Sequence, residues 1–203
     1  MAEAAVTPAA LLADATWVRA RIGGAAKLYG CAAPEVIGTI WWYSLSSVLV
    51  APTMESLAAG GAVLDPSLDA VELDIVPDGR FLGSRSTRAL SGPLGPALGA
   101  ALNTAITTVA QVTGARSQAL GAIATDSIAN RLLWASAPQL AADVVASTGL
   151  GLPAPRYVSV GRTQAVKRAS CCLIYEVGNP KCVSCPRQTP EERDERLRAA
   201  LGG

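Results

Sequence analysis

Residues 116–135 read RSQALGAIATDSIANRLLWA and hold the clearest helical pattern in the chain. Its apolar side chains recur every three or four residues, as in a helix with one buried face. The members of that face are Leu120, Ile123, Ala124, Ile128, Leu132 and Ala135. A second stripe, Asp126, Asn130 and Trp134, is spaced by four, and we expect it to lie away from the apolar face.

Capping and breaking residues on both sides of this segment predict more helices. They cover residues 7–22, 34–60, 97–112, 138–148 and 189–201. Thr7 and Pro8 mark the first start, and Gly23–Gly24 its end. Pro52 predicts a kink in the second helix, and Thr189 with Glu192 predicts a capping box on the last one.

The spacing of apolar residues changes from helical to alternating in the stretch DAVELDIVPDGRFLG, residues 69–83. Val71, Leu73 and Ile75 alternate with acidic residues, and Pro77-Asp78-Gly79 follows as a turn. We therefore predict a mostly α fold with a small β-hairpin, of the α+β class. The Gly/Pro-rich stretch GLGLPAP, residues 149–155, divides a helical region (1–155) from a C-terminal segment (156–203) that ends in a short helix.

The composition limits the chemistry. The 203 residues are 50% hydrophobic and 16% charged, with a net charge of +1, so no global basic excess favours nucleic acid. The absence of histidine excludes Ser-His and Cys-His nucleophile pairs and every histidine-containing metal site.

The long uncharged stretch between Glu35 and Glu55 has the length of a membrane span, but its polar residues and Pro52 favour a buried helix. With no basic, apolar leader, we expect a cytoplasmic protein.

Four of the five cysteines lie within fifteen residues, in the pattern C-C-x9-C-x-x-C. They are Cys171, Cys172, Cys182 and Cys185. In a reducing compartment, clustered cysteines favour metal binding over disulfides. Four thiolates suit Zn²⁺ or an iron–sulfur cluster, and an adjacent pair is unusual for a structural zinc site. The isolated Cys31 is typical of a small buried hydrophobe.

The stretch RASCCLIYEVGNPKCVSCP, residues 168–186, resembles the C-terminal [2Fe–2S] motif of the FhuF-like ferric-siderophore reductases. Arg168, Ser170, Tyr175 and Pro186 occupy the family's flanking positions. The family has ten residues between the cysteine pairs, and this chain has nine. DSIANRLLW, residues 126–134, resembles a helix upstream of that motif.

This resemblance implies a helical siderophore-binding region followed by a [2Fe–2S] loop held by the four clustered cysteines. It implies a cytoplasmic enzyme that reduces siderophore-bound Fe(III) to Fe(II) with one electron from the cluster, with no catalytic residue beyond the cluster. Siderophore oxygens hold Fe(II) far more weakly than Fe(III), so reduction releases the metal. No dinucleotide or P-loop motif is present, so we expect an external donor, either a ferredoxin or a flavin- or NAD(P)H-dependent reductase. Peripheral association with inner-membrane uptake machinery is a further expectation.

Residues 156–187 carry six basic side chains against Glu176 alone. Such charges can raise the cluster potential, attract an anionic ferric chelate or attract an acidic donor. The candidate substrate-binding residues are Asp126, Asn130, Trp134, Arg162, Lys167 and Arg168, with the aromatic run Trp41-Trp42-Tyr43 as a further candidate. Two other functions stay open: a [2Fe–2S] electron carrier without its own siderophore site, and a zinc-stabilised interaction module.

Overall fold

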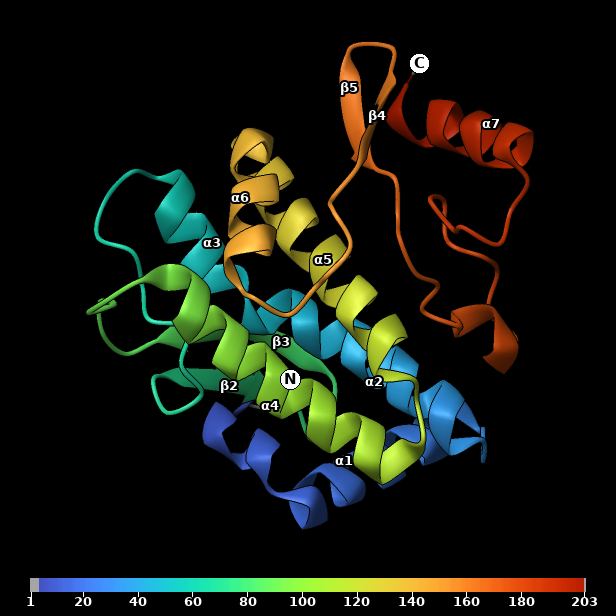
Figure 1. Cartoon of the computed structure of the whole chain (residues 1–203). Coiled ribbons are helices and arrows are strands. Elements are labelled where there is room, and N and C mark those ends of the chain that lie inside the picture. Colours follow the sequence, from blue (N-terminus) through green and yellow to red (C-terminus); the bar gives the residue numbers. More distant parts are fainter. Residues whose placement is uncertain (1–3, 203) are drawn as a thin grey trace.

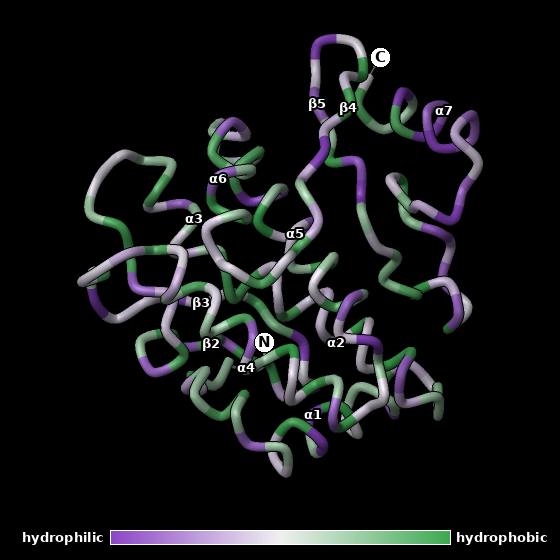
Figure 2. Tube along the Cα trace, viewed as in Figure 1, coloured by the Kyte–Doolittle hydropathy of each residue, from purple (hydrophilic) through white to green (hydrophobic). Residues whose placement is uncertain are grey.

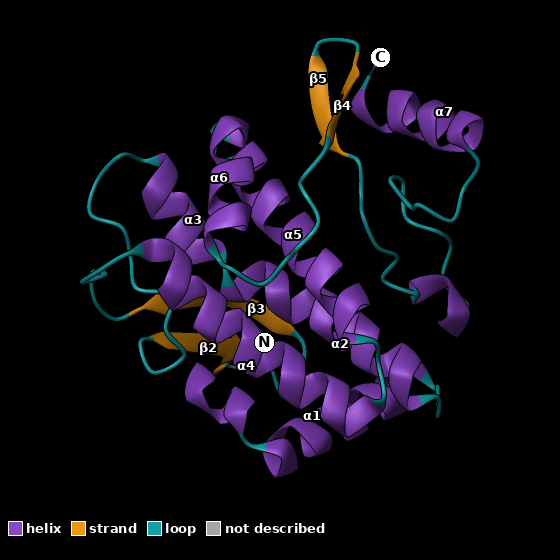
Figure 3. Cartoon of the chain, in the orientation of Figure 1, coloured by secondary structure: helices purple, strands orange, loops and turns teal. Residues whose placement is uncertain are grey.

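The computed structural model describes residues 4–202, and helices dominate it (Figures 1 and 3). The α-helices are α1 (Ala15–Tyr29), α2 (Pro34–Leu49), α3 (Ala51–Ala58), α4 (Leu94–Thr113), α5 (Ser117–Trp134), α6 (Ala141–Ser147) and α7 (Pro190–Leu201). Short 3-10 turns are η1 (Ala9–Ala13), η2 (Pro138–Leu140) and η3 (Ile174–Val177). The predicted α+β class with mostly helical content is confirmed.

The strands form two small antiparallel sheets. Strands β1 (Ala5–Pro8), β2 (Val71–Ile75) and β3 (Phe81–Ser86) lie in that order in one sheet, and β4 (Tyr157–Val160) pairs with β5 (Thr163–Val166) in the other. The predicted hairpin is therefore confirmed as β2–β3, with β1 as an added edge strand. The β4–β5 hairpin was not predicted, because only Val160 and Val166 of its residues are buried and no alternating pattern marks it.

Helix α2 lies at the centre of the hydrophobic core, between α1, α4 and α5, with β3 against it. Trp41 and Trp42 are both buried there. The stretch Pro34–Ala58, which covers α2 and α3, is long and apolar enough to cross a membrane by length and composition alone, but 78% of its most apolar window is buried in this fold. Its side chains are therefore used in packing, in agreement with the buried helix expected from the sequence.

Three hydrogen bonds fix α5 on α2. The indole Nε1 of Trp42 donates to the Leu120 carbonyl at 2.8 Å, and the hydroxyls of Ser46 and Ser127 lie 2.7 Å apart. Arg131 donates to the backbone carbonyl of Ser47 at 2.8 Å. Because buried polar groups must find partners, these bonds specify one register between the two helices. That register sets the position of Asp126, which lies beside Ser127 on α5.

The start of the first helix differs from the prediction. Residues 5–8 pair with β2 instead of capping a helix, and α1 begins at Ala15 with Asp14 as its N-cap. The Asp14 carboxylate accepts the backbone N–H groups of Thr16 and Trp17. The helix continues past Gly23–Gly24 to Tyr29. Sheet pairing and tertiary packing here outweigh the local signals of a proline and two glycines.

The remaining helix predictions agree with the structure, with small changes at the ends. The long second helix breaks at Val50, where Pro52 falls in the first turn of α3. The segment that begins at Pro138 opens with η2 before α6. The predicted capping box of α7 is present, with the Thr189 hydroxyl accepting the Glu192 N–H at 3.2 Å.

Candidate metal centre

The cysteine segment, residues 167–189, runs outside the helical core, beside α5 and α2 (Figure 1). Asp126 of α5 holds its start. The Asp126 carboxylate accepts the backbone N–H of Ala169 at 2.8 Å and that of Ser170 at 3.3 Å. Asp126 is only 2% exposed, so the segment covers this part of α5. One carboxylate therefore fixes the two residues that precede the first cysteine.

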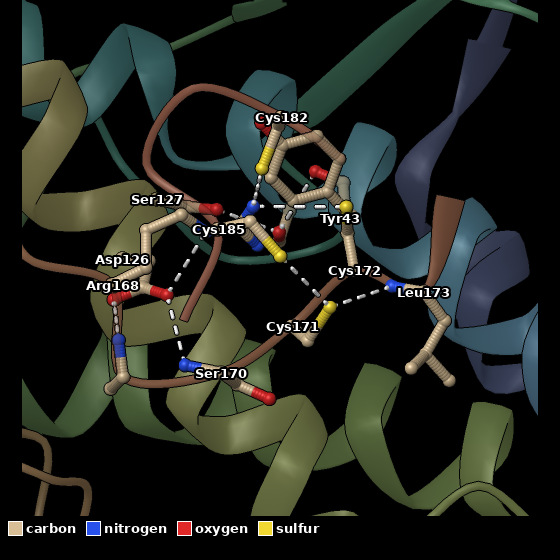
Figure 4. A network of polar contacts seen from close by, with 12 residues as sticks. Tyr43, Asp126, Ser127, Arg168, Ser170, Cys171, Cys172, Leu173, Cys182 and Cys185 are labelled. Carbon is tan, nitrogen blue, oxygen red and sulfur yellow. Dashed lines mark hydrogen bonds and ion pairs between the residues drawn. The ribbon is translucent and has the colours of Figure 1, made fainter. Parts of the chain in front are cut away.

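The four sulfur atoms of the segment come together (Figure 4). The Sγ atoms of Cys171 and Cys185 are 3.7 Å apart, and one guanidinium nitrogen of Arg168 lies 3.7 Å from the Cys172 sulfur and 3.2 Å from that of Cys182. Hydrogen bonds from the Cys171 and Cys182 thiols, with the charge of Arg168, hold the pKa of Cys172 well below its usual range. The pairs that are distant in sequence are thus adjacent in space.

Arg168 is buried between these sulfurs and α5. Its Nε lies 3.5 Å from a carboxylate oxygen of Asp126, and its guanidinium carbon lies 4.6 Å from the centre of the Tyr43 ring. Burial by itself disfavours the charged form, but Tyr43 and the sulfurs of Cys172 and Cys182 outweigh it and raise the pKa of Arg168. Arg168 therefore remains a cation at the centre of the site.

The backbone around the cysteines is shaped for close approach to sulfur. Leu173 has a positive φ of 61°, unusual for a residue other than glycine, and its N–H points back to the Cys171 sulfur at 3.4 Å. Cys185 and Cys182 close a tight turn through a 3.0 Å backbone hydrogen bond. The buried Gln188 donates from its side chain to the Cys182 carbonyl at 2.6 Å. These contacts hold the backbone that carries Cys171, Cys182 and Cys185.

Helix α7 supports the second cysteine pair from outside. Arg196 donates to the carbonyl of Lys181 at 2.9 Å, and the Lys181 amine donates to the carbonyl of Arg187 at 3.0 Å. Leu197 is the buried residue of α7, and Figure 2 shows that most of this helix is hydrophilic. The terminal helix therefore holds the C-x-x-C turn in place through polar contacts more than through a core of its own.

The structure separates the six predicted substrate-binding residues. Asp126 and Arg168 are buried in the network just described, so the expectation that Asp126 lies on an outward polar stripe is wrong. Asp126 is covered because the cysteine segment, which begins more than forty positions further along the chain, folds over this part of α5. Asn130 and Lys167 are half-buried, and Lys167 follows β5. Trp134 and Arg162 are exposed and line one cavity of about 710 Å³, to which no cysteine contributes.

Two residues of the site were not singled out for this role by the sequence. Tyr43 was predicted only as part of an aromatic run, yet it points away from its buried neighbours and covers the Arg168 guanidinium. Gln188 lies outside the quoted motif and carried no signal. The 100° turn between adjacent helical residues does indicate that Tyr43 cannot share the face of Trp42. Its partner, however, comes from another part of the chain.

The site fits a sulfur-ligated cluster in two respects. Its four sulfurs form one connected group, in which Cys171 faces Cys185 and the Arg168 guanidinium faces Cys172 and Cys182. In addition, the Nη2 group of Arg168 is buried without a hydrogen-bond acceptor among residues 4–202, and its Nε has only the Asp126 carboxylate at 3.5 Å. Buried donors of this kind are costly unless something accepts them. A cluster with exposed sulfur atoms provides such acceptors.

Comparison with known families decides the type of cluster. Residues 168–187 match the family described as the FhuF 2Fe-2S C-terminal domain. Over these residues the chain is similar to that iron–sulfur domain. The predicted resemblance and the predicted [2Fe–2S] cofactor are confirmed, and the nine-residue spacing does not prevent the match. The match covers the cysteine segment and not the helical region. No curated protein and no solved structure matched the chain.

Proposed function

We propose that this iron–sulfur protein is a cytoplasmic ferric-siderophore reductase, which passes single electrons to siderophore-bound Fe(III) and thereby releases iron as Fe(II). The match of residues 168–187 to the FhuF 2Fe-2S C-terminal domain carries this proposal, together with the sequence resemblance to that family of reductases. When bound, the [2Fe–2S] cluster supplies one-electron chemistry at the four cysteines.

The chain positions its cysteines suitably for this function. Cys172 and Cys185 are 2% and 1% exposed, whereas Cys171 is half-buried and lines a surface cavity. A chelate in that cavity would come close to Cys171 without opening the rest of the site to water. The buried cation of Arg168 favours the extra negative charge of the reduced state, so it favours acceptance of the electron.

The other parts of the proposal concern the partners. We infer that electrons come from a separate protein, either a ferredoxin or a flavin- or NAD(P)H-dependent reductase, because the sequence holds no dinucleotide-binding motif. A cytoplasmic protein of this kind would meet its substrate where siderophores enter, which is the basis for proposing peripheral association with the inner-membrane uptake machinery.

The test is steady-state reduction of a panel of ferric siderophores by the purified, cluster-loaded protein, with a reduced ferredoxin as donor. A ferrous-specific chelator records the Fe(II) formed. We expect acceleration by the protein, loss of that acceleration in Cys172→Ser, and no change in Cys31→Ser, because Cys31 lies outside the cysteine segment. If no siderophore is reduced faster while an unrelated redox protein accepts the electron, the protein is an electron carrier.

A further inference from the structure

Two adjoining cavities lie beside the cysteines, and together they are called the groove. The first has a volume of about 660 Å³ and the second about 380 Å³. Both are lined by Arg116, Ala119, Ala169 and Ser170, so they adjoin over the start of α5 and the start of the cysteine segment. The second also reaches Cys171. Sites for small molecules have volumes in this range.

The groove is positively charged. Arg116, Arg156 and Arg187 line it, and all three are exposed. None of them has an ion-pair partner among residues 4–202. The one acidic side chain in the lining is Glu35, which leaves an excess of two positive charges. These arginines come from three separate parts of the chain, so their meeting is a property of the fold.

The start of α5 adds to this charge. Arg116 is the N-cap residue, its side chain does not cap the helix, and the first turn contains no acidic residue. The N-terminus of an uncapped helix carries partial positive charge from its free N–H groups. Ser117 and Gln118 of this turn line the first cavity. The helix terminus and the arginines therefore favour the same kind of ligand, an anion.

We propose that this groove is the substrate site and that it binds ferric chelates of net negative charge in preference to neutral ones. The proposal rests on the function proposed above and specifies its substrate class. The negative charge of the cysteine sulfurs, of which only that of Cys171 lines the groove, repels an anion, and the three arginines offset that repulsion. The reduced protein gives one electron to the chelate, Fe(III) becomes Fe(II), and a ferredoxin-class donor then restores the reduced protein.

Binding is tested apart from electron transfer with gallium chelates, because Ga(III) has the charge of Fe(III) and is not reduced. The probes are a gallium tricatecholate, with net charge −3, and a neutral gallium trihydroxamate, titrated into the oxidised holoprotein by calorimetry. We expect the tricatecholate to bind at least tenfold more tightly. Arg116→Gln, Arg156→Gln and Arg187→Gln should each weaken it roughly tenfold, the usual effect of losing one charged hydrogen bond.

The matched control is Arg19→Gln, because Arg19 is also exposed, lies on α1 and lines neither cavity of the groove. It should leave both affinities unchanged, and the visible spectrum of each variant should show a loaded cluster. Equal affinity for the two chelates, or normal tricatecholate affinity in the three arginine variants, overturns the proposal. The proposal is also overturned if the arginine variants lose affinity only for the reduced ferredoxin, since the groove would then bind the donor.

Failure of the groove proposal can be distinguished from failure of the reductase proposal. If the protein binds gallium tricatecholate through these arginines but leaves the ferric tricatecholate oxidised, the groove stands and the reductase function fails. If it reduces neutral ferric trihydroxamates while the arginine variants bind and reduce normally, the reductase function stands and the groove fails.

Discussion

Arg168 places one positive charge between the cysteine sulfurs and the Asp126 carboxylate, in a setting from which water is excluded. The charge acts strongly there because screening by solvent is weak. A cation next to a cluster stabilises the reduced form, which carries one more negative charge than the oxidised form. Arg168 is therefore a positioning residue that should also set the redox potential.

We predict that Arg168→Gln lowers the midpoint potential of the cluster by roughly 60–130 mV. Loss of one hydrogen bond from a charged donor is worth about 1.5–3 kcal/mol, and 59 mV corresponds to tenfold for one electron. Potentiometric titration followed by visible absorption measures this. Arg168→Lys keeps the charge and should shift the potential less, while Arg19→Gln, at an exposed position on α1, is the control. An unchanged potential in Arg168→Gln would rule out the proposed influence of this charge.

Helix α5 is the element that connects the core to the cysteine segment, and its two faces illustrate what a sequence can reveal. Its apolar stripe was predicted correctly except at its last member. Leu120, Ile123, Ala124, Ile128 and Leu132 are all fully buried, whereas Ala135 is half-buried and follows the end of the helix. The role of Asp126 could not be predicted, since its partners Arg168, Ala169 and Ser170 are distant in sequence.

We predict that Asp126→Ala releases the start of the cysteine segment from α5. Removal of one partner from a buried ion pair costs about 3–5 kcal/mol, and here two backbone N–H groups also lose their acceptor. Hydrogen exchange at Ala169 and Ser170 should accelerate on the order of a hundredfold. Asn130→Ala, one turn further along α5, should leave these amides protected. If they stay protected in Asp126→Ala as well, the carboxylate does not hold the segment.

Helix α4 packs closely against the end of α6. A Cβ atom at Gly99 would collide with the backbone carbonyl of Thr148, which cannot move aside as a flexible side chain can. We predict that Gly99→Ala lowers the free energy of unfolding by about 1–3 kcal/mol. Gly23→Ala in α1 is the control, because nothing lies within 4 Å of the added carbon. It should raise stability by about 0.5–1 kcal/mol, as measured by urea unfolding. Equal effects of the two changes would contradict this packing.

At the scale of the whole molecule, the hydrophobic core and the metal centre are largely separate. The buried core residues come from between Ala9 and Val145, and the cysteine segment contributes only half-buried Ile174 and Val177 at its edge. The sequence predicted the cysteine ligands well because they are close together in the chain and follow a specific pattern. It did not predict the groove, because Arg116, Arg156 and Arg187 meet only after folding.

Because of this separation, we predict that removal of the cluster leaves the helical region folded. Far-UV circular dichroism of the apoprotein should keep nearly all the helical signal, whereas hydrogen exchange should accelerate within residues 168–188. Binding of a metal group is commonly coupled to folding of the residues that hold it, and here those residues form a small part of the structure. Loss of most of the helical signal in the apoprotein would show that the core depends on the cluster.

Single-turnover reduction tests the proposed reductase function most directly. The protein is reduced without oxygen, freed of reductant and mixed rapidly with a ferric tricatecholate in the presence of a ferrous trap. The visible absorption that the protein loses on reduction should return at the rate at which the trap captures iron. One Fe(II) should form for each electron the protein held. If the cluster stays reduced across all ferric siderophores tested, or is re-oxidised without any Fe(II) appearing, the protein does not deliver its electron to siderophore-bound iron.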